Sequence, residues 1–203
     1  MTSPLGVILA GGLATRMGGG DKGALMLGGR CLFDRAADRL GLQVAGLAIN
    51  ANGAPGRLVE FGLPILADSV PGYPGPLAGV LAGLDWAAAR GAGSIVTVAV
   101  DTPFFPFDLA ERLQRGAQRA GTQIAIAATE EEGRLRRQPV FALWPVALRG
   151  DLRSALEQGV RKVSYWADSH GAASVLFASE GFFNINTPED LAQAEAMLPE
   201  AER

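Results

Sequence analysis

A glycine-rich segment with two cationic side chains follows the first apolar run of the chain. Residues 5–9 read Leu-Gly-Val-Ile-Leu, which has the length and branching of a buried strand. Residues 10–23 contain six glycines together with Arg16 and Lys22. Glycine lets a ligand approach backbone N–H groups closely, and such groups form concave anion sites. The segment is therefore interpreted as a phosphate-binding loop, with a flexible surface loop as the alternative.

Two common phosphate-binding motifs do not fit this segment. Gly18, Gly20 and Gly23 spell G-x-G-x-x-G, but the dinucleotide motif starts directly at the end of a strand, and this one starts well after Leu9. The Walker motif needs a lysine followed by serine or threonine, whereas Lys22 precedes a glycine. The phosphate site belongs to another class.

Polar side chains stand at the ends of the later apolar runs. Asn50, Asp68 and Asp101 each come at or directly after such a run. Open α/β sheets bind ligands outside the carboxyl ends of their parallel strands. We expect these three side chains and the glycine-rich loop to converge on one site.

Asp101 follows the most hydrophobic strand of the chain. A carboxylate in that place is costly unless it is hydrogen-bonded or holds a cation. Mg²⁺ commonly takes one or two carboxylates and completes its shell with phosphates and water. Asp101 is predicted to bind Mg²⁺, and the alternative is a cap for the turn before Pro103.

Asp68 and Asn50 carry oxygens that suit a purine base. Guanine presents its N1–H and its exocyclic amine as neighbouring donors, which a carboxylate or carbonyl oxygen can accept. Each residue could equally belong to a turn, since Asp68 precedes Ser69 and a proline, and an Asn-Gly turn begins at Asn52. Asn52 is assigned to that turn.

Apolar runs alternate with segments of helical period along the chain, which predicts an α/β fold with a mostly parallel central sheet and helices on both faces. Strands are predicted at residues 5–9, 43–50, 63–67, 94–100, 123–128, 140–144 and 173–177. Helices are predicted at residues 33–40, 77–90, 106–118, 146–158, 161–169 and 188–198, the last with Thr187 as N-cap.

Composition narrows the class of protein. At 203 residues, with no linker rich in proline, glycine or serine, the chain is predicted to be one domain. Its single cysteine, Cys31, excludes an intrachain disulfide and is interpreted as a small buried hydrophobe. A net charge of −3 gives no reason to expect nucleic-acid binding. No signal peptide or apolar stretch of about 18 residues is present, so we expect a cytoplasmic protein without a membrane anchor.

Several motifs resemble one family of nucleotidyltransferases. These are residues 9–12 (Leu-Ala-Gly-Gly), 16–19 (Arg-Met-Gly-Gly), 21–23 (Asp-Lys-Gly), 72–79 (Gly-Tyr-Pro-Gly-Pro-Leu-Ala-Gly) and 183–188 (Phe-Asn-Ile-Asn-Thr-Pro). The first three are similar to the signature loop of Rossmann-like nucleotidyltransferases, and the Gly-Gly-x-Asp-Lys-Gly ending looks most like the molybdenum cofactor guanylyltransferases (MobA proteins). Two departures are Gln138-Pro139 and Arg30-Cys31. The first puts second-substrate contacts there in doubt.

The resemblance implies a three-layer Rossmann-like domain over residues 1–203, with a nucleotide-binding half (1–120) and a second-substrate half (121–203). It implies transfer of GMP from GTP to the terminal phosphate of molybdopterin or Mo-molybdopterin, with release of pyrophosphate, Mg²⁺ as cofactor and molybdoenzyme maturation proteins as partners. A related cytidylyltransferase, a sugar-phosphate nucleotidyltransferase and a nucleotide-binding module without catalysis remain alternatives.

The resemblance also assigns residues, by position in this sequence. The GTP-contacting positions are Leu9, Ala10, Gly11, Lys22, Asn50, Asp68 and Asp101. Catalysis is expected from Lys22, Arg16 and Asp101, and metal binding from Asp101. The second-substrate candidates are Gly19, Gly75, Gly79, Asn184 and Asn186. Arg134, Arg136 and Arg137 either meet an anionic substrate or form a charged ribbon face, and His170 receives no role.

Overall fold

A twisted, mostly parallel sheet forms the centre of the computed structural model, which describes residues 3–11, 22–52, 58, 61–70 and 75–200. Within these residues the sheet has seven strands in the order β5-β4-β1-β6-β8-β7-β9. All neighbours pair in parallel except those of β8, which is antiparallel to β6 and to β7. The strands are β1 (Leu5–Leu9), β4 (Leu47–Asn50), β5 (Ile65–Leu66), β6 (Ser94–Ala99), β7 (Ala125–Glu131), β8 (Arg134–Pro145) and β9 (Ala173–Leu176).

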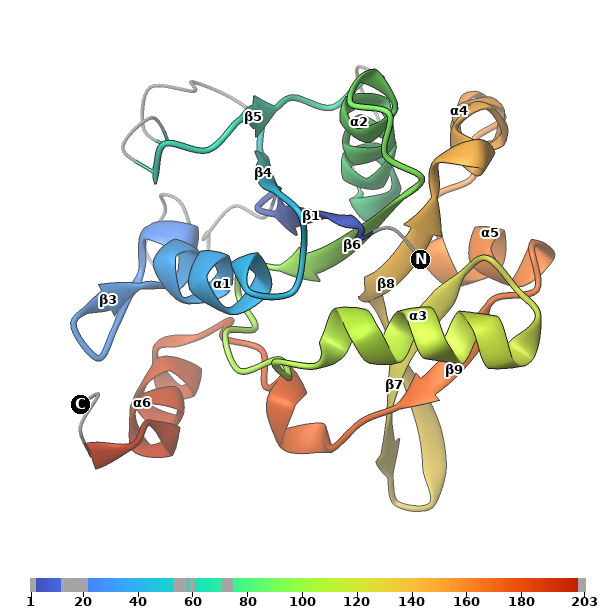
Figure 1. Cartoon of the computed structure of the whole chain (residues 1–203). Helices are drawn as coiled ribbons and strands as arrows, with labels where there is room; N and C mark the ends of the chain where they lie inside the picture. Colours follow the sequence, from blue (N-terminus) through green and yellow to red (C-terminus); the bar gives the residue numbers. More distant parts are fainter. Residues whose placement is uncertain (1–2, 12–21, 53–57, 59–60, 71–74, 201–203) are drawn as a thin grey trace.

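Helices cover both faces of this sheet, as Figure 1 shows. One face carries α1 (Leu32–Gly41) and α3 (Leu109–Ala120). The other carries α2 (Pro76–Ala89), α4 (Arg149–Glu157) and α5 (Val163–Ser169). The last helix, α6 (Pro188–Met197), lies beside a small two-stranded ribbon of β2 (Met26–Leu27) and β3 (Arg30–Cys31). Three 3₁₀ turns complete the described part: η2 (Lys22–Ala24), η4 (Val146–Leu148) and η5 (Ser179–Phe182).

The predicted fold class is confirmed. β1 is buried along its whole length, and its alternate side chains enter the two apolar layers on opposite faces of the sheet: Ile8 packs with α1 and α3, and Val7 packs with α2. The strands β5, β4, β1 and β6 come from the first 120 residues and the other three from the remainder. The division into two functional halves stays a prediction. None of the helices in the described ranges is long and apolar enough to cross a bilayer.

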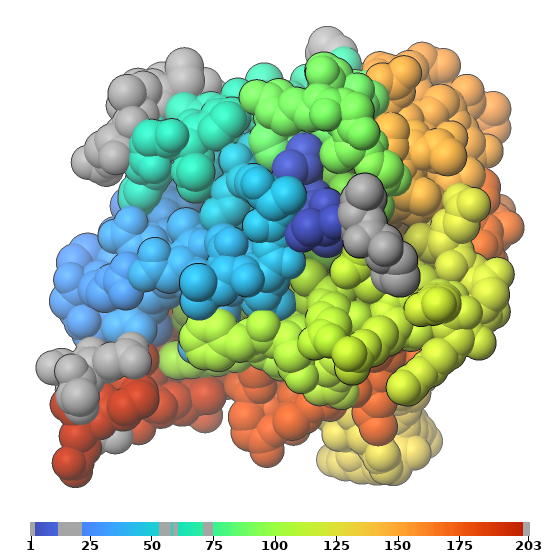
Figure 2. All heavy atoms as spheres, in the orientation of Figure 1, coloured from blue at the N-terminus to red at the C-terminus, as the bar shows by residue number. Residues whose placement is uncertain are grey.

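β7 and β8 form a hairpin whose tip protrudes from the body of the molecule, at the lower edge of Figure 2. Both strands run further toward this tip than the predicted ranges of residues 123–128 and 140–144. The pairing slips between Ile126, opposite Ala142, and Ala127, opposite Gln138. Pro139 lies in this irregularity and has no N–H for the ladder. The slip matters because Val140, which follows Pro139, lines the candidate site described below.

Two predicted boundaries were wrong near Gln43. The strand expected over residues 43–50 begins only at Leu47, and the helix expected from Pro106 begins at Leu109. The side chain of Gln43 contacts the start of α3. Its Nε2 donates to the Pro106 carbonyl at 3.1 Å, and its Oε1 accepts from the Ala110 N–H at 3.0 Å. The side chain thus caps α3 instead of extending β4.

The residues before α6 and α1 bear on two further predictions, those for Thr187 and Cys31. Thr187 is confirmed as the N-cap of α6, in a capping box with Asp190. The interpretation of Cys31 as a small buried hydrophobe holds in part, since Cys31 packs against the apolar core. Cys31 is half-buried, and its Sγ accepts from the Asp34 N–H at 3.4 Å at the N-cap of α1. Burial raises the pKa of this thiol, which disfavours the nucleophilic thiolate.

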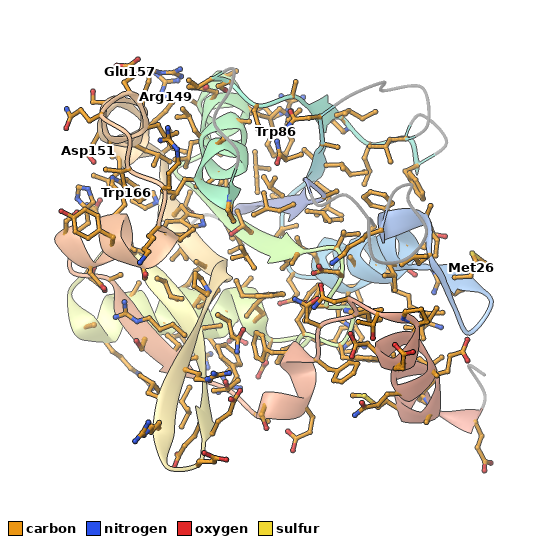
Figure 3. The ribbon with its side chains drawn as sticks, turned by 180° about the vertical axis from the view of Figure 1, so that it is seen from behind. Met26, Trp86, Arg149, Asp151, Glu157 and Trp166 are labelled. Carbon is orange, nitrogen blue, oxygen red and sulfur yellow. The ribbon has the colours of Figure 1, made fainter. Side chains whose placement is uncertain are left out.

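His170 has a structural partner on the neighbouring helix. Its Nε2 lies 2.7 Å from Asp151 Oδ1, and Trp166 Nε1 donates to the same oxygen at 2.7 Å. Figure 3 shows Asp151 on α4 above Trp166 on α5. The hydrogen bond from Trp166 is the main cause that lowers the pKa of Asp151, and the bond with His170 adds to it. This cluster joins α4 to α5.

The lowered pKa of Asp151 predicts a pH-dependent contribution to stability. A carboxylate whose pKa is lower in the folded state stabilises that state above the unfolded pKa of about 3.9, and this contribution is lost as pH falls through the folded pKa. We expect Asp151→Asn to lower the free energy of unfolding in urea at pH 6–8, and the difference from the unmodified chain to shrink below about pH 4. A difference independent of pH would contradict this origin.

Candidate active site

The polar residues predicted to converge do line one cavity. Its volume is about 400 Å³, and it opens at the carboxyl ends of β1, β4, β5 and β6. This agrees with the general position of ligand sites in open α/β sheets. Its lining residues are Leu9, Gly11, Lys22, Asn50, Asn52, Asp68, Gly75, Pro76, Ala99, Val100, Asp101 and Val140.

A charged cluster occupies one end of this cavity. Lys22 Nζ lies 3.0 Å from Asp101 Oδ2 and 2.5 Å from Asn186 Oδ1. The side chains of Lys22 and Asp101 are only 13% and 18% exposed, so water screens the pair less than a surface pair. Two residues that are 79 positions apart in the sequence are thus in direct contact. The prediction that the loop lysine and the strand-end aspartate face the same crevice is confirmed.

Backbone contacts explain why these side chains meet. The Ile185 N–H donates to the carbonyl of Asp101 at 2.8 Å, which joins the segment before α6 to the end of β6. The Asp190 carboxylate accepts from the N–H of Asn186 at 2.9 Å, and this bond is the main cause that lowers the pKa of Asp190. The start of α6 therefore fixes Asn186 opposite Lys22.

Gly23 lets Lys22 sit against α1. A Cβ atom on Gly23 would lie 2.0 Å from the ring of Phe33, which is itself buried. No side chain other than hydrogen fits there without displacing the ring. The glycine after the lysine is thus a packing requirement that brings η2 close to the core.

A second cluster lies at the other end of the cavity, around Asp68. Asn50 Nδ2 donates to Asp68 Oδ1 at 3.0 Å and also to the Leu66 carbonyl at 3.0 Å. Asn52 Nδ2 donates to Asp68 Oδ2 at 2.7 Å, and its Oδ1 accepts from the Asp68 N–H at 3.0 Å. Both carboxylate oxygens of Asp68 thus have an amide donor behind them and keep lone pairs for a further donor.

This cluster corrects the interpretation of Asn52 and gives Asn50 a further role. Assigning Asn52 to a turn alone missed its place in the cavity wall, because its partner is Asp68, 16 residues later in the chain. Asn50 lines the same cavity, and both N–H groups of its amide are used within the protein, so only its oxygen could accept from a base and that contact stays a prediction. Asn50 is 4% exposed and holds Asp68 in place.

The glycines at the start of α2 have distinct roles. Gly75 is the N-cap, with φ 137° and ψ 164°, a conformation that strains any other residue, and it lines the cavity. Gly79 is not in the lining. It lies against Asn50, and a Cβ atom there would be 2.2 Å from Asn50 Oδ1.

Gly79→Ala is expected to weaken nucleotide binding despite the better helix propensity of alanine. The new methyl group must displace the buried Asn50 amide and, with it, Asp68. Overpacking of this kind costs about 1–3 kcal/mol, more than the roughly 1 kcal/mol that alanine gains over glycine in a helix. Gly150→Ala on α4 is the matched control, since a Cβ atom added there would have nothing within 4 Å. Urea unfolding and nucleotide titration of both variants check this, and equal behaviour would contradict it.

The other predicted site residues differ in where they lie relative to the cavity. Ala10 is buried, and its N–H donates to the Asn50 carbonyl at 2.9 Å. Asn184 is exposed and does not line the cavity. Arg16 and Gly19 lie outside the described residues.

Two of the hairpin arginines, Arg136 and Arg137, have partners within the protein. Arg136 lies 3.0 Å from Glu131. Arg137 pairs with Asp168 on α5, and its Nε donates to Ser174 Oγ on β9 at 2.8 Å. Gln138, at the departure from the family pattern, donates to Thr129 Oγ1 at 3.2 Å. Arg137 therefore connects β8 to α5 and β9.

The oxygen atoms of Asp101 and Asn186 suit a metal ion such as Mg²⁺, which takes its other ligands from phosphate groups and water. Among the described residues, no group of three or more His, Cys, Asp or Glu side chains could hold a metal ion alone. Asp101 and Asn186 nevertheless hold an ammonium group between two oxygens. One carboxylate with phosphate and water ligands is a common Mg²⁺ environment.

Comparison with known proteins identifies the family. Residues 6–172 match the MobA-like NTP transferase domain. The chain belongs to the MobA-like NTP transferases. Relatives of this MobA-like transferase include a molybdenum cofactor guanylyltransferase from Cereibacter sphaeroides (strain ATCC 17029 / ATH 2.4.9), 52% identical over 194 residues that cover 95% of this chain and 96% of that protein. Another, from Nitrobacter hamburgensis, is 46% identical over 198 residues, covering 95% and 93%.

Solved structures share the fold of this MobA-like transferase. Molybdopterin-guanine dinucleotide biosynthesis protein A from Archaeoglobus fulgidus is 25% identical, with a TM-score of 0.73 over 95% of this chain and 97% of that chain. A 4-diphosphocytidyl-2C-methyl-D-erythritol synthase from Anaerococcus prevotii is 13% identical, with a TM-score of 0.74 over 97% and 96%. The second likeness concerns the fold alone.

Proposed function

We propose that this chain transfers GMP from GTP to the terminal phosphate of molybdopterin, or Mo-molybdopterin, and releases pyrophosphate. One observation supports this most directly. The Lys22–Asp101 pair and the Asp68 carboxylate lie in the wall of the same cavity of about 400 Å³, which offers a charged end for phosphates and a carboxylate end for a base. Membership of a family with guanylyltransferase relatives at about half identity agrees with it.

The proposed reaction needs no dedicated general base. The attacking group is a phosphate, which is already an anion, and the bond that breaks joins the α- and β-phosphates of GTP. The protein therefore has to position two anions in line and offset their charge. Lys22, next to Asp101, supplies a cation at the phosphate end of the cavity, and Arg16 with the amides after Ala10 is assigned to the leaving pyrophosphate.

Mg²⁺ is the proposed cofactor, held by Asp101 with Asn186 as a second oxygen. When bound, it offsets the negative charge of the phosphates. Lys22 would then give up one of its present partners, because the ammonium group now occupies both oxygens. The N–H donor released in this way would be available to phosphate oxygens.

Asp68 is the proposed reader of guanine. Its two oxygens are oriented by hydrogen bonds from Asn50 and Asn52. The free lone pairs suit the N1–H and the 2-amino group of guanine, two neighbouring donors that cytosine does not present. Leu9 and Val100 line the same cavity and supply apolar contact for the nucleoside.

Pyrophosphate release tests this proposal. The protein is incubated with GTP, Mg²⁺ and each candidate acceptor in turn: molybdopterin, Mo-molybdopterin or a sugar phosphate. We expect release with the pterin and not with the sugar phosphate. Tighter binding of CTP than of GTP would reject the guanylyl assignment, and GTP binding without release with any acceptor would favour a module without catalysis.

A further inference from the structure

The carboxylate of Asp85 on α2 joins three elements outside the cavity. Ser69 Oγ donates to Asp85 Oδ2 at 2.5 Å. From α4, Arg153 Nη2 donates to both carboxylate oxygens of Asp85, at 2.9 and 2.8 Å. Arg149 Nε lies 3.7 Å from Oδ1, and Figure 3 places Arg149 on α4 beside α2. Asp85 is 29% exposed and is not among the residues that line the cavity.

This cluster contacts the residue that directly follows Asp68. Asn50 holds Asp68 from the side of β4, and Asp85 holds Ser69 from the side of α2. Asp68 therefore lies between two side-chain contacts that approach from different elements. The Asp85 carboxylate thus accepts from the Ser69 hydroxyl and from Arg153 on α4.

The segment around Asp68 needs such contacts because its strand is short. β5 comprises only Ile65 and Leu66, lies at the edge of the sheet and pairs with β4 alone. A two-residue edge strand fixes little backbone, and ordering a loose segment on binding costs conformational entropy. Side-chain hydrogen bonds on both sides of Asp68 supply the order that the strand does not.

We propose that Asp85, together with Ser69 and Arg153, positions Asp68 for recognition of the guanine base. The proposal rests on the proposed function, since it assigns Asp85 to the base-reading end of that site. Asp85 is a positioning residue: it acts through Ser69 on Asp68 and does not contact the nucleotide. The affinity for GTP should depend on it more than the affinity for ITP, which lacks the 2-amino group.

Equilibrium binding of GTP and ITP in the presence of Mg²⁺ tests this with two variants of the full chain. Ser69→Ala removes one hydroxyl, and Asp85→Ala removes the acceptor and its charge. A hydrogen bond to a charged group contributes roughly tenfold or more in an equilibrium constant. We expect GTP affinity to fall by about tenfold in both variants and ITP affinity by about threefold, so the GTP preference shrinks about threefold. Thermal unfolding confirms that each variant is folded.

Asp151→Asn is the matched control. Asp151 is also a hydrogen-bonded aspartate, which joins α4 to α5 but has no contact with the Asp68 segment. We expect it to leave the ratio of GTP to ITP affinity unchanged.

The outcomes separate this inference from the proposed function. If the unmodified chain prefers GTP and Ser69→Ala keeps that preference, the positioning role is wrong and the proposed function stands. If both affinities fall equally in the variants, the cluster is structural only, and the inference is overturned. If the unmodified chain itself shows no preference for GTP, the guanine assignment fails and this inference with it. Should Asp85→Ala not fold, Ser69→Ala decides the question.

Discussion

Replacing Asp101 by asparagine is expected to slow pyrophosphate release by about 10²- to 10³-fold, the usual cost of removing one preorganised electrostatic group from an active site. Asparagine keeps the size of the side chain and one acceptor oxygen. It removes the charge that pairs with Lys22 Nζ at 3.0 Å and that is proposed to hold Mg²⁺. Steady-state rates with GTP and the pterin acceptor, measured at several Mg²⁺ concentrations, give the size of the loss.

The dependence on Mg²⁺ distinguishes this role from a general loss of structure. If Asp101 holds the metal, half-maximal activity of Asp101→Asn should need more Mg²⁺ than that of the unmodified chain. Asp108→Asn is a matched control, since Asp108 lies just before α3, is 53% exposed, and pairs with Arg112 at 3.7 Å. Activity within threefold of the unmodified chain at saturating GTP and Mg²⁺ would remove Asp101 from the mechanism.

Long apolar runs made the main layers of the fold predictable. β1 matches its predicted range of residues 5–9, α2 is shifted by one residue at both ends, and the buried β6 ends one residue earlier than predicted. These segments bury most of their length, so the hydrophobic pattern alone decides their structure. Because a polar residue ends β4 and another follows each of β5 and β6 within two residues, the position of the site followed from the same pattern.

Short elements and chain order could not be predicted in the same way. η2, β2 and β3 contain two or three residues each, too few to show a period of 2 or 3.6. Strands were predicted near β7 and β8, but the insertion of β8 between β6 and β7 was not. That placement depends on pairing between strands more than 40 residues apart, such as Thr97 with Ala142. Local sequence contains no signal for it.

In the candidate site, too, local sequence did not predict which side chains contact one another. The pattern Asn-Gly favours a turn at Asn52 on local grounds, whereas the structure uses that amide to orient Asp68. Similarly, Ser69 and Asp85 carry no motif, and their bond becomes visible only when α2 is packed beside the end of β5. Residue type indicated which groups could bind a ligand, and tertiary contacts decided which of them hold the others in place.

Lys22→Ala is expected to reduce pyrophosphate release by about 10²- to 10³-fold, or about 2.7–4 kcal/mol in the activation barrier. Lys22 Nζ is the cation held between Asp101 and Asn186 at the phosphate end of the cavity. Lys22→Arg is expected to recover only part of the rate. It keeps the charge, but the planar guanidinium is larger than an ammonium group that contacts two oxygens at 3.0 and 2.5 Å.

The double variant Lys22→Ala, Asp101→Asn gives the sharper test. Groups that contact each other and act on the same phosphate charge do not contribute independently, so their effects on rate are not multiplicative. We expect the double variant to be slower than either single variant, but to retain more activity than the product of the two single effects allows. A rate equal to that product would mean that the two groups act at separate places on the substrate, and the shared phosphate site would have to be abandoned. Because each variant is compared at saturating GTP, a change in nucleotide affinity alone cannot produce this pattern.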